Sequence, residues 1–167
     1  MTAPHIPHWR RCRSMLVAIL QEHLPDEWDL MDLSPIPADR ITDDDTRLQV
    51  NDCLYVCYIR TIREARTKDW TDAGFEFEIE ILRFGASRRA AEDVCGDTES
   101  AVCHVLGDHL GVYADDDYAL DYWVKLEIGD SESLKAKAAA GAFAHALNLL
   151  VTVYARCPRT ADHAPDA

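Results

Sequence analysis

Residues 69–84, DWTDAGFEFEIEILRF, decide the fold of this chain because apolar and acidic side chains alternate strictly over seven of them, 75–81. An alternation with a period of two predicts a β-strand that has one buried and one solvated face. The apolar face is expected to comprise Phe75, Phe77, Ile79 and Ile81, and the other face Glu76, Glu78 and Glu80. The three carboxylates could form a catalytic cluster, a cation site or the solvated side of a sheet.

The regular spacing of these glutamates argues against catalysis. Alternate residues of a strand lie about 7 Å apart, a separation at which two carboxylates could serve a glycosidase or help to bind a cation. Catalytic acids need surroundings that move their pKa values apart, whereas a regular row gives each group the same surroundings. We therefore interpret the row as the solvated face of a half-buried sheet.

Apolar residues at three- and four-residue spacing predict two amphipathic helices. The first spans 8–24 and stops at Pro25, and the second spans 86–110 and stops at Gly111, a residue type that often follows a helix C-terminus. Residues 25–52 contain nine Asp and Glu residues, so they are predicted to be an acidic loop that could include one edge strand.

Two strands are predicted to form an antiparallel hairpin. Residues 53–59 are seven successive apolar residues, which is typical of a strand covered on both faces. The segment TKDWTDAG, residues 67–74, then turns the chain into the alternating strand.

Two further strands complete the predicted sheet. Residues 122–128 alternate and lead into a turn at 129–131, and residues 142–155 form the last strand. Residues 135–142 between them could be a helical turn or a loop. This order of elements predicts an α+β fold, a single domain in which two amphipathic helices pack on one face of an antiparallel β-sheet.

The charge of the chain limits its partners. Its 167 residues include 30 Asp and Glu against 17 Lys and Arg, a formal net charge of −13. Such a charge disfavours non-specific binding to nucleic acid or to an anionic membrane. No apolar segment reaches the length of a membrane span, and the N-terminal residues lack the pattern of a secretory signal, so we expect no membrane partner.

Six cysteines have two open interpretations. None forms a C-x-x-C pair or a zinc-finger spacing; they are Cys12, Cys53, Cys57, Cys95, Cys103 and Cys157. They could be small, buried or half-buried thiols. Alternatively, Cys12 and Cys157, near the two ends of the predicted domain, could form disulfides with neighbouring chains of an assembly.

No motif in the sequence supports an enzyme, a cofactor or a metal. His104 and His109 are five residues apart, rather than the four that ligation from one helix face favours. The runs Asp43, Asp44, Asp45 and 115–117 lack the alternating acids and closing Glu of a calcium loop. The chain also lacks a nucleophile elbow, a P-loop and a dinucleotide-binding glycine pattern. We therefore expect no catalytic residues, no cofactor and no metal ligands.

The order of elements resembles that of the tail terminator proteins of long-tailed bacteriophages, the family of the lambda-type minor tail protein U. The resemblance covers residues 8–156. It is carried by the helix 8–24 and by the segments LYVCYIRTIREAR, TKDWTDAG, FEFEIEILRF, AAEDVCGDTESAVCHVL and ALNLLVTVYAR. The chain differs from smaller family members in an N-terminal arm, 1–7, a C-terminal tail, 157–167, and its six cysteines. Stopper and tail-completion proteins of the same neck also have small α+β domains.

The resemblance implies a structural virion protein, made in the host cytoplasm and located at the head–tail neck. Subunits of that family form a hexameric ring that caps the tail tube, stops its polymerisation and docks to the head connector. The implied partners are a second copy of the chain, the tail tube protein and the connector or stopper protein, with a sheath if the tail contracts. Genomic DNA would pass through without specific binding, and Glu76, Glu78 and Glu80 would be candidates to face the lumen.

Two other predictions follow from the charges. Arg10, Arg11 and Arg13 form a positive cluster at the start of the first helix, and we expect it to meet the acidic loop of an adjacent subunit, including Asp43, Asp44 and Asp45. The main alternative function is an acidic DNA mimic that inhibits a nucleic-acid enzyme. A small hydrolase that uses Glu76, Glu78 or Glu80 is a weaker alternative.

Overall fold

The structure is a computed structural model, which describes residues 8–28, 48–49, 52–68, 70–108, 123–134, 137–138 and 143–158. Several predicted features lie outside these residues: the arm 1–7, most of the acidic loop with Asp43, Asp44 and Asp45, the run 115–117, His109 and Gly111.

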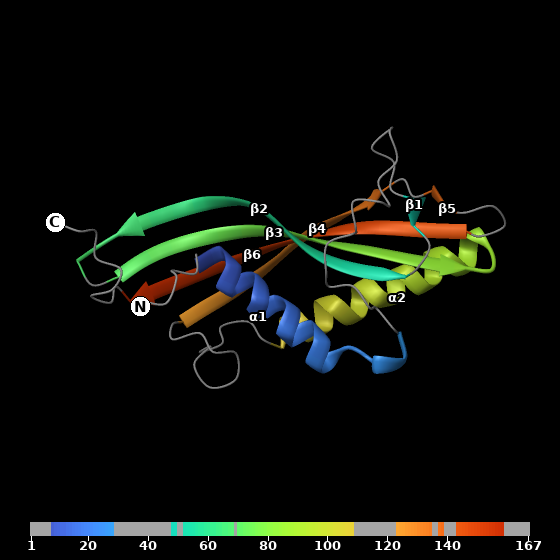
Figure 1. Ribbon diagram of the computed structural model, residues 1–167, viewed down its shortest axis with the longest axis horizontal. Coiled ribbons are helices and arrows are strands. Elements are labelled where there is room, and N and C mark those ends of the chain that lie inside the picture. Colours follow the sequence, from blue (N-terminus) through green and yellow to red (C-terminus); the bar gives the residue numbers. More distant parts are fainter. Residues whose placement is uncertain are drawn as a thin grey trace, which may run out of the picture.

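The described residues form an α+β domain, as the sequence predicts. Along the chain the elements are α1 (His8–His23), the 3₁₀ turn η1 (Asp26–Trp28), β1 (Leu48–Gln49), β2 (Cys53–Arg66), β3 (Trp70–Gly85), α2 (Arg88–Gly107), β4 (Trp123–Leu134), β5 (Lys137–Ala138) and β6 (Phe143–Pro158). The main sheet is antiparallel with the strand order β2-β3-β6-β4, and β1 and β5 form a separate short parallel pair. Both helices lie on the same side of the main sheet (Figure 1).

The alternating segment lies in β3, in the interior of the sheet. β3 is hydrogen-bonded to β2 on one side and to β6 on the other. Its four predicted core residues are at most 5% exposed: Phe75, Phe77, Ile79 and Ile81. They pack against both helices and against the matching face of β6, formed by Leu149, Val151 and Val153. The predicted face of the strand is therefore confirmed.

The helices begin and end for local reasons. At the start of α2, the Ser87 hydroxyl accepts a hydrogen bond from the Ala90 amide at 3.1 Å, which caps the helix. A Cβ at Gly85 would lie 2.4 Å from the Ala91 nitrogen, so only glycine permits this close passage from β3 into α2. The helix ends at Gly107, with Asp108 as its C-cap, earlier than the predicted last residue, Leu110.

The prediction that residues 53–59 are covered on both faces is wrong. β2 is an edge strand, in which Leu54 and Val56 are buried but Ile59 is 41% exposed. Helix α1 covers only part of this edge, where Trp9 stacks on Tyr58 with ring centroids 4.4 Å apart. The aromatic residues of the run thus lie at the margin of the core, which explains why the segment is so apolar without being central.

Two predicted turns are parts of strands. The segment TKDWTDAG contributes its last five residues to β3, which begins at Trp70. The predicted turn at 129–131 is a bulge inside β4, where the register with β6 shifts between Ile128 and Ser131. A Cβ at Gly129 would lie 3.3 Å from the Leu150 side chain, so the glycine lets β4 approach β6 at the bulge.

The two faces of β3 should respond differently to mutation. Phe77→Ala removes a fully buried ring and should lower the free energy of unfolding by about 3–5 kcal/mol. Glu78→Gln, on the opposite face, should lower it by less than about 0.5 kcal/mol. Urea unfolding followed by circular dichroism measures both values. Comparable losses in the two variants would contradict this assignment of the faces.

Candidate functional site

The sheet face opposite the helices gathers carboxylates from two strands. The register places Thr152 of β6 opposite Glu76 and Asn148 opposite Glu80. Glu127 and Glu132 of β4 follow in the same two rows. Residues that lie opposite one another in antiparallel strands point to the same face. We call this surface the acidic face and define it by Glu76, Glu78, Glu80, Glu127 and Glu132.

A neutral column separates the two acidic columns. On this face β6 presents Asn148, Leu150 and Thr152 between the glutamates of β3 and those of β4. Two strand spacings amount to about 10 Å, slightly more than the Debye length of about 8 Å in physiological salt. The strand order thus limits repulsion between the columns while both remain on one surface.

The glutamates of β3 are neither equivalent nor fully solvated, in contrast to the expectation from their spacing. All three are half-buried. Glu76 accepts a hydrogen bond of 2.6 Å from the Arg60 guanidinium, and its side chain is only 14% exposed. Glu78 instead lies between Cys57 and Leu150, two uncharged residues in the register. The twist and the neighbouring strands therefore differentiate groups that look identical in the sequence.

An ion pair bounds the acidic face at one end. The Arg156 guanidinium donates to both carboxylate oxygens of Asp72, at 2.8 and 3.0 Å. The hydrogen bond and the negative charge of Asp72 raise the pKa of Arg156. This bidentate contact links β3 to β6 and neutralises the charge beyond Glu76.

The predicted basic cluster lies on α1 at the β2 edge. Arg10 is exposed, with its guanidinium 5.3 Å from the Trp9 ring, and the guanidinium of Arg13 lies 5.5 Å from the Tyr55 ring. Neither these two arginines nor Arg11 forms an ion pair with a carboxylate in the part of the chain that the structure describes. The proposed counterpart, Asp43, Asp44 and Asp45, lies outside that part, so this pairing stays a prediction.

The cysteines differ in accessibility. Cys12 has no exposed surface and belongs to the core, so a disulfide to another chain would require its side chain to leave the core. The side chain of Cys157 lies outside the described residues. Burial, and secondarily the charge of Glu99, raises the pKa of the Cys95 thiol to about 12, and the same two causes raise the pKa of Cys103. These two thiols are therefore less reactive than ordinary ones.

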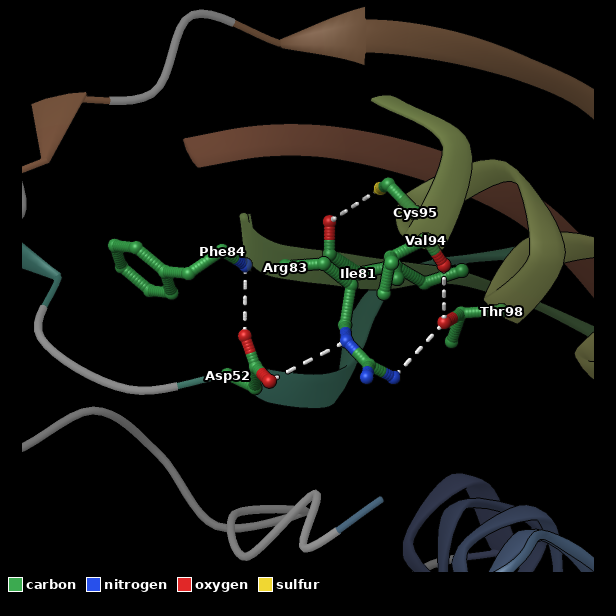
Figure 2. A network of polar contacts seen from close by, with 7 residues as sticks. All are labelled: Asp52, Ile81, Arg83, Phe84, Val94, Cys95 and Thr98. Carbon is green, nitrogen blue, oxygen red and sulfur yellow. Dashed lines mark hydrogen bonds and ion pairs between the residues drawn. The ribbon is translucent and has the colours of Figure 1, made fainter. Parts of the chain in front are cut away.

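A buried polar network beneath the sheet was not predicted (Figure 2). Arg83 is 7% exposed and lies at the end of the core-facing row of β3. Its Nη1 donates to the Thr98 hydroxyl at 3.0 Å, and its Nε lies 3.5 Å from Oδ2 of Asp52. The other oxygen of Asp52 accepts from the Phe84 amide at 2.7 Å. The guanidinium also lies 5.3 Å from the Trp28 ring.

This network connects four segments of the fold. It joins the start of β2, the end of β3, helix α2 and the turn η1 around one cation. The Thr98 hydroxyl donates a hydrogen bond to the Val94 carbonyl at 2.7 Å while it accepts one from Arg83, so both its donor and its acceptor are used. The sequence carried a signal for Arg83, because extending the alternation of Phe75 to Ile81 by one step places an arginine on the core side.

Neither a metal site among the described residues nor a match to a known sequence indicates a function for this chain. Within the described residues, no three His, Cys, Asp or Glu side chains converge to hold a metal ion. None of the helices described is long and apolar enough to cross a membrane. Comparison with known protein families and with curated proteins found no match for the sequence.

The contacts of the buried Arg83 should contribute more to stability than the ion pair of the exposed Arg60. Arg83→Met removes the guanidinium of a side chain that is 9% exposed, together with its contacts to Thr98 and Asp52, and should lower the free energy of unfolding by about 3 kcal/mol. Arg60→Met removes the guanidinium of a side chain that is 68% exposed from a Glu76 that is 14% exposed, and should lower it by about 1 kcal/mol, because water can reach the carboxylate once the arginine is gone. Chemical denaturation measures both, and the double variant Arg83→Met/Asp52→Asn should lose less than the sum of its single changes. Equal losses at Arg83 and Arg60 would contradict this interpretation.

Cys95 should make stability depend on alkaline pH. Its thiol has a folded pKa of about 12, above the ordinary 9.0, so the unfolded chain loses this proton first. The stabilisation is complete below pH 9 and is lost as pH rises towards 12. The stability difference between the unmodified protein and Cys95→Ala should therefore shrink above pH 9 in urea titrations. Val102→Ala, on the same helix, should show a difference independent of pH, and identical pH profiles for the two variants would refute the role of Cys95.

Proposed function

We propose that this protein is a structural virion protein, a tail terminator of a long-tailed phage that forms a ring at the head–tail neck. The observation that carries the proposal is the division of the sheet. Two helices cover one face, whereas the other bears five carboxylates and no helix among the described residues. The order of elements on which the resemblance rests, from α1 through the β2–β3 hairpin to α2 and β6, is also present.

The acidic face suits the wall of a channel that DNA must cross. A channel wall that bound phosphates would slow the passage of the genome. Carboxylates instead repel phosphates over about one Debye length, about 8 Å in physiological salt. In this proposal Glu76, Glu78 and Glu80, near the middle of the sheet, face the lumen. The Arg60–Glu76 and Arg156–Asp72 pairs reduce the negative charge towards one end of the face.

A ring of identical subunits needs two different patches that fit one another. Heterologous contacts of this kind close into a ring when the rotation between subunits is suitable. In the proposed assembly the ring caps the tail tube protein on one side and meets the connector or stopper protein on the other. Neither contact requires catalysis.

An acidic DNA mimic is the second candidate, because the carboxylates gather on one surface. Along β3 the alternate glutamates lie about 7 Å apart, about twice the rise between phosphates of one DNA strand. A mimic would present this face to a nuclease or a repressor, as a monomer or a dimer. The two functions therefore differ in assembly state and in what the glutamates contact.

The purified protein should form rings, alone or at the ends of tail tubes, because closed heterologous contacts build rings, and the resemblance implies about six subunits in each. Analytical ultracentrifugation gives the mass, and negative-stain electron microscopy shows the rings. Added to polymerising tail tube protein, the protein should shorten the tubes and appear at one end. A monomer that leaves tube length unchanged would overturn the proposal.

The triple variant Glu76→Gln/Glu78→Gln/Glu80→Gln separates the two candidate functions. In the ring proposal it still assembles and caps tubes, but DNA is retained in the lumen, measured by the rate of ejection from reconstituted particles. In the mimic alternative the same variant no longer competes with DNA for a nucleic-acid enzyme, and no rings form in any sample.

A further inference from the structure

Opposite edges of the main sheet carry opposite charges that find no partner within the described chain. β2 and β4 are the two edge strands. At the β2 edge, α1 presents Arg10, Arg11 and Arg13. At the β4 edge Glu127, Asp130 and Glu132 are exposed, and they form no ion pair with any described residue. Each subunit therefore has a basic and an acidic edge.

Two rows of residues across the sheet end with carboxylates of the β4 edge. One row runs from Tyr55 through Glu80 and Asn148 to Glu132, and the guanidinium of Arg13 lies 5.5 Å from the Tyr55 ring at its start. A neighbouring row runs from Arg60 through Glu76 and Thr152 to Glu127. Both rows end with a carboxylate at the β4 edge. At the β2 edge, the second row begins with Arg60, which pairs with Glu76, and Arg13 of α1 lies beside the first residue of the other row.

The outward side of α1 also offers a shallow groove. Its volume is about 460 Å³. Arg10 and Arg13 line the groove, and its apolar lining comes from Trp9, Val17 and Ala18. A groove with apolar lining and guanidinium groups at its side fits a chain segment that presents carboxylates.

Bulges at both edges favour contact through side chains over strand pairing. β2 has register irregularities between Tyr58 and Arg60 and between Thr61 and Arg63, and β4 has one between Ile128 and Ser131. Such bulges interrupt the ladder of backbone groups that another strand would need. The β4 bulge instead exposes Asp130 between the two glutamates of the edge.

We infer that the α1 groove of one copy receives the β4 edge of a second copy, with Arg10 and Arg13 facing Glu127, Asp130 and Glu132. The inference deepens the proposed ring function, on which it rests, by naming the two patches of the subunit contact. The contact is heterologous, so it repeats around a ring. It also leaves Glu76, Glu78 and Glu80 of β3 outside the contact, where they can face a lumen.

Two charge-reversed variants test this contact in solution. Variant one is Arg10→Glu/Arg13→Glu, and variant two is Glu127→Arg/Glu132→Arg. Each places like charges at every contact with its own kind, so each should associate at least about tenfold more weakly than the unmodified protein. An equimolar mixture should assemble again, because every contact between variant one and variant two pairs opposite charges. Sedimentation velocity measures all three samples.

Matched controls separate the contact from changes in net charge and folding. Arg88→Glu/Arg89→Glu changes the charge as variant one does, on α2, and should leave assembly unchanged. A single chain carrying both reversals should assemble as the unmodified protein does. Ser14→Trp fills the groove from an exposed position without changing charge, and should weaken assembly. Circular dichroism and thermal unfolding verify the fold of every variant.

The outcomes distinguish this contact from the function on which it rests. The proposed contact is wrong if either variant alone assembles normally. It is also wrong if the folded variants fail to assemble as a mixture. The second result would move the counterpart of α1 elsewhere, for example to Asp43, Asp44 and Asp45. Tube capping that persists in both variants would leave the ring function standing without this contact. Rescue by mixing, in a protein that never caps tubes, would establish the contact and reject the terminator function.

Discussion

The structure depends on the burial of one face of β3. This strand has neighbours on both sides, so its backbone is fully paired and its two faces must meet different surroundings. Phe75, Phe77, Ile79 and Ile81 supply the apolar surface on which both helices pack. Burying this surface leaves only one orientation for the intervening glutamates, because a shift by one residue would exchange the faces. The charge on the outer surface is thus a consequence of the core.

The same constraint explains the polarity of the subunit. The core face fixes the orientation of each strand's side chains, and in the observed order, with β6 beside β3 and β4 beside β6, the charges of these strands fall into rows. The uncharged side chains of β6 separate two acidic columns, while α1 brings arginines to the opposite edge. A protein with a large negative charge thereby retains a local positive patch. In the contact proposed above, this arrangement brings unlike edges of two copies together.

Local patterns in the sequence predicted most elements but not their neighbours. The faces of α1, β3, α2 and β6 follow from periodicity, which each segment carries within itself. The strand order does not, because it depends on pairings such as Asp72 with Arg156, 84 residues apart. The bulge at Gly129 was interpreted as a turn, since glycine and aspartate suit both, and only the packing of Leu150 distinguishes them. The network around Arg83 was overlooked, although its position on the core side could have revealed that a buried cation needed a carboxylate.

The position of β6 links folding to the exposure of the candidate contacts. β6 lies between β3 and β4, and in the main sheet β4 pairs with no other strand. Until β6 is in place, β3 has one unpaired side, and the acidic columns of β3 and β4 do not share a surface. The acidic edge therefore exists only in a chain whose last described strand has joined the sheet. If copies associate through the proposed contact, a chain whose β6 has not yet joined the sheet cannot associate. Its incomplete sheet lacks one of the two patches that a heterologous contact requires.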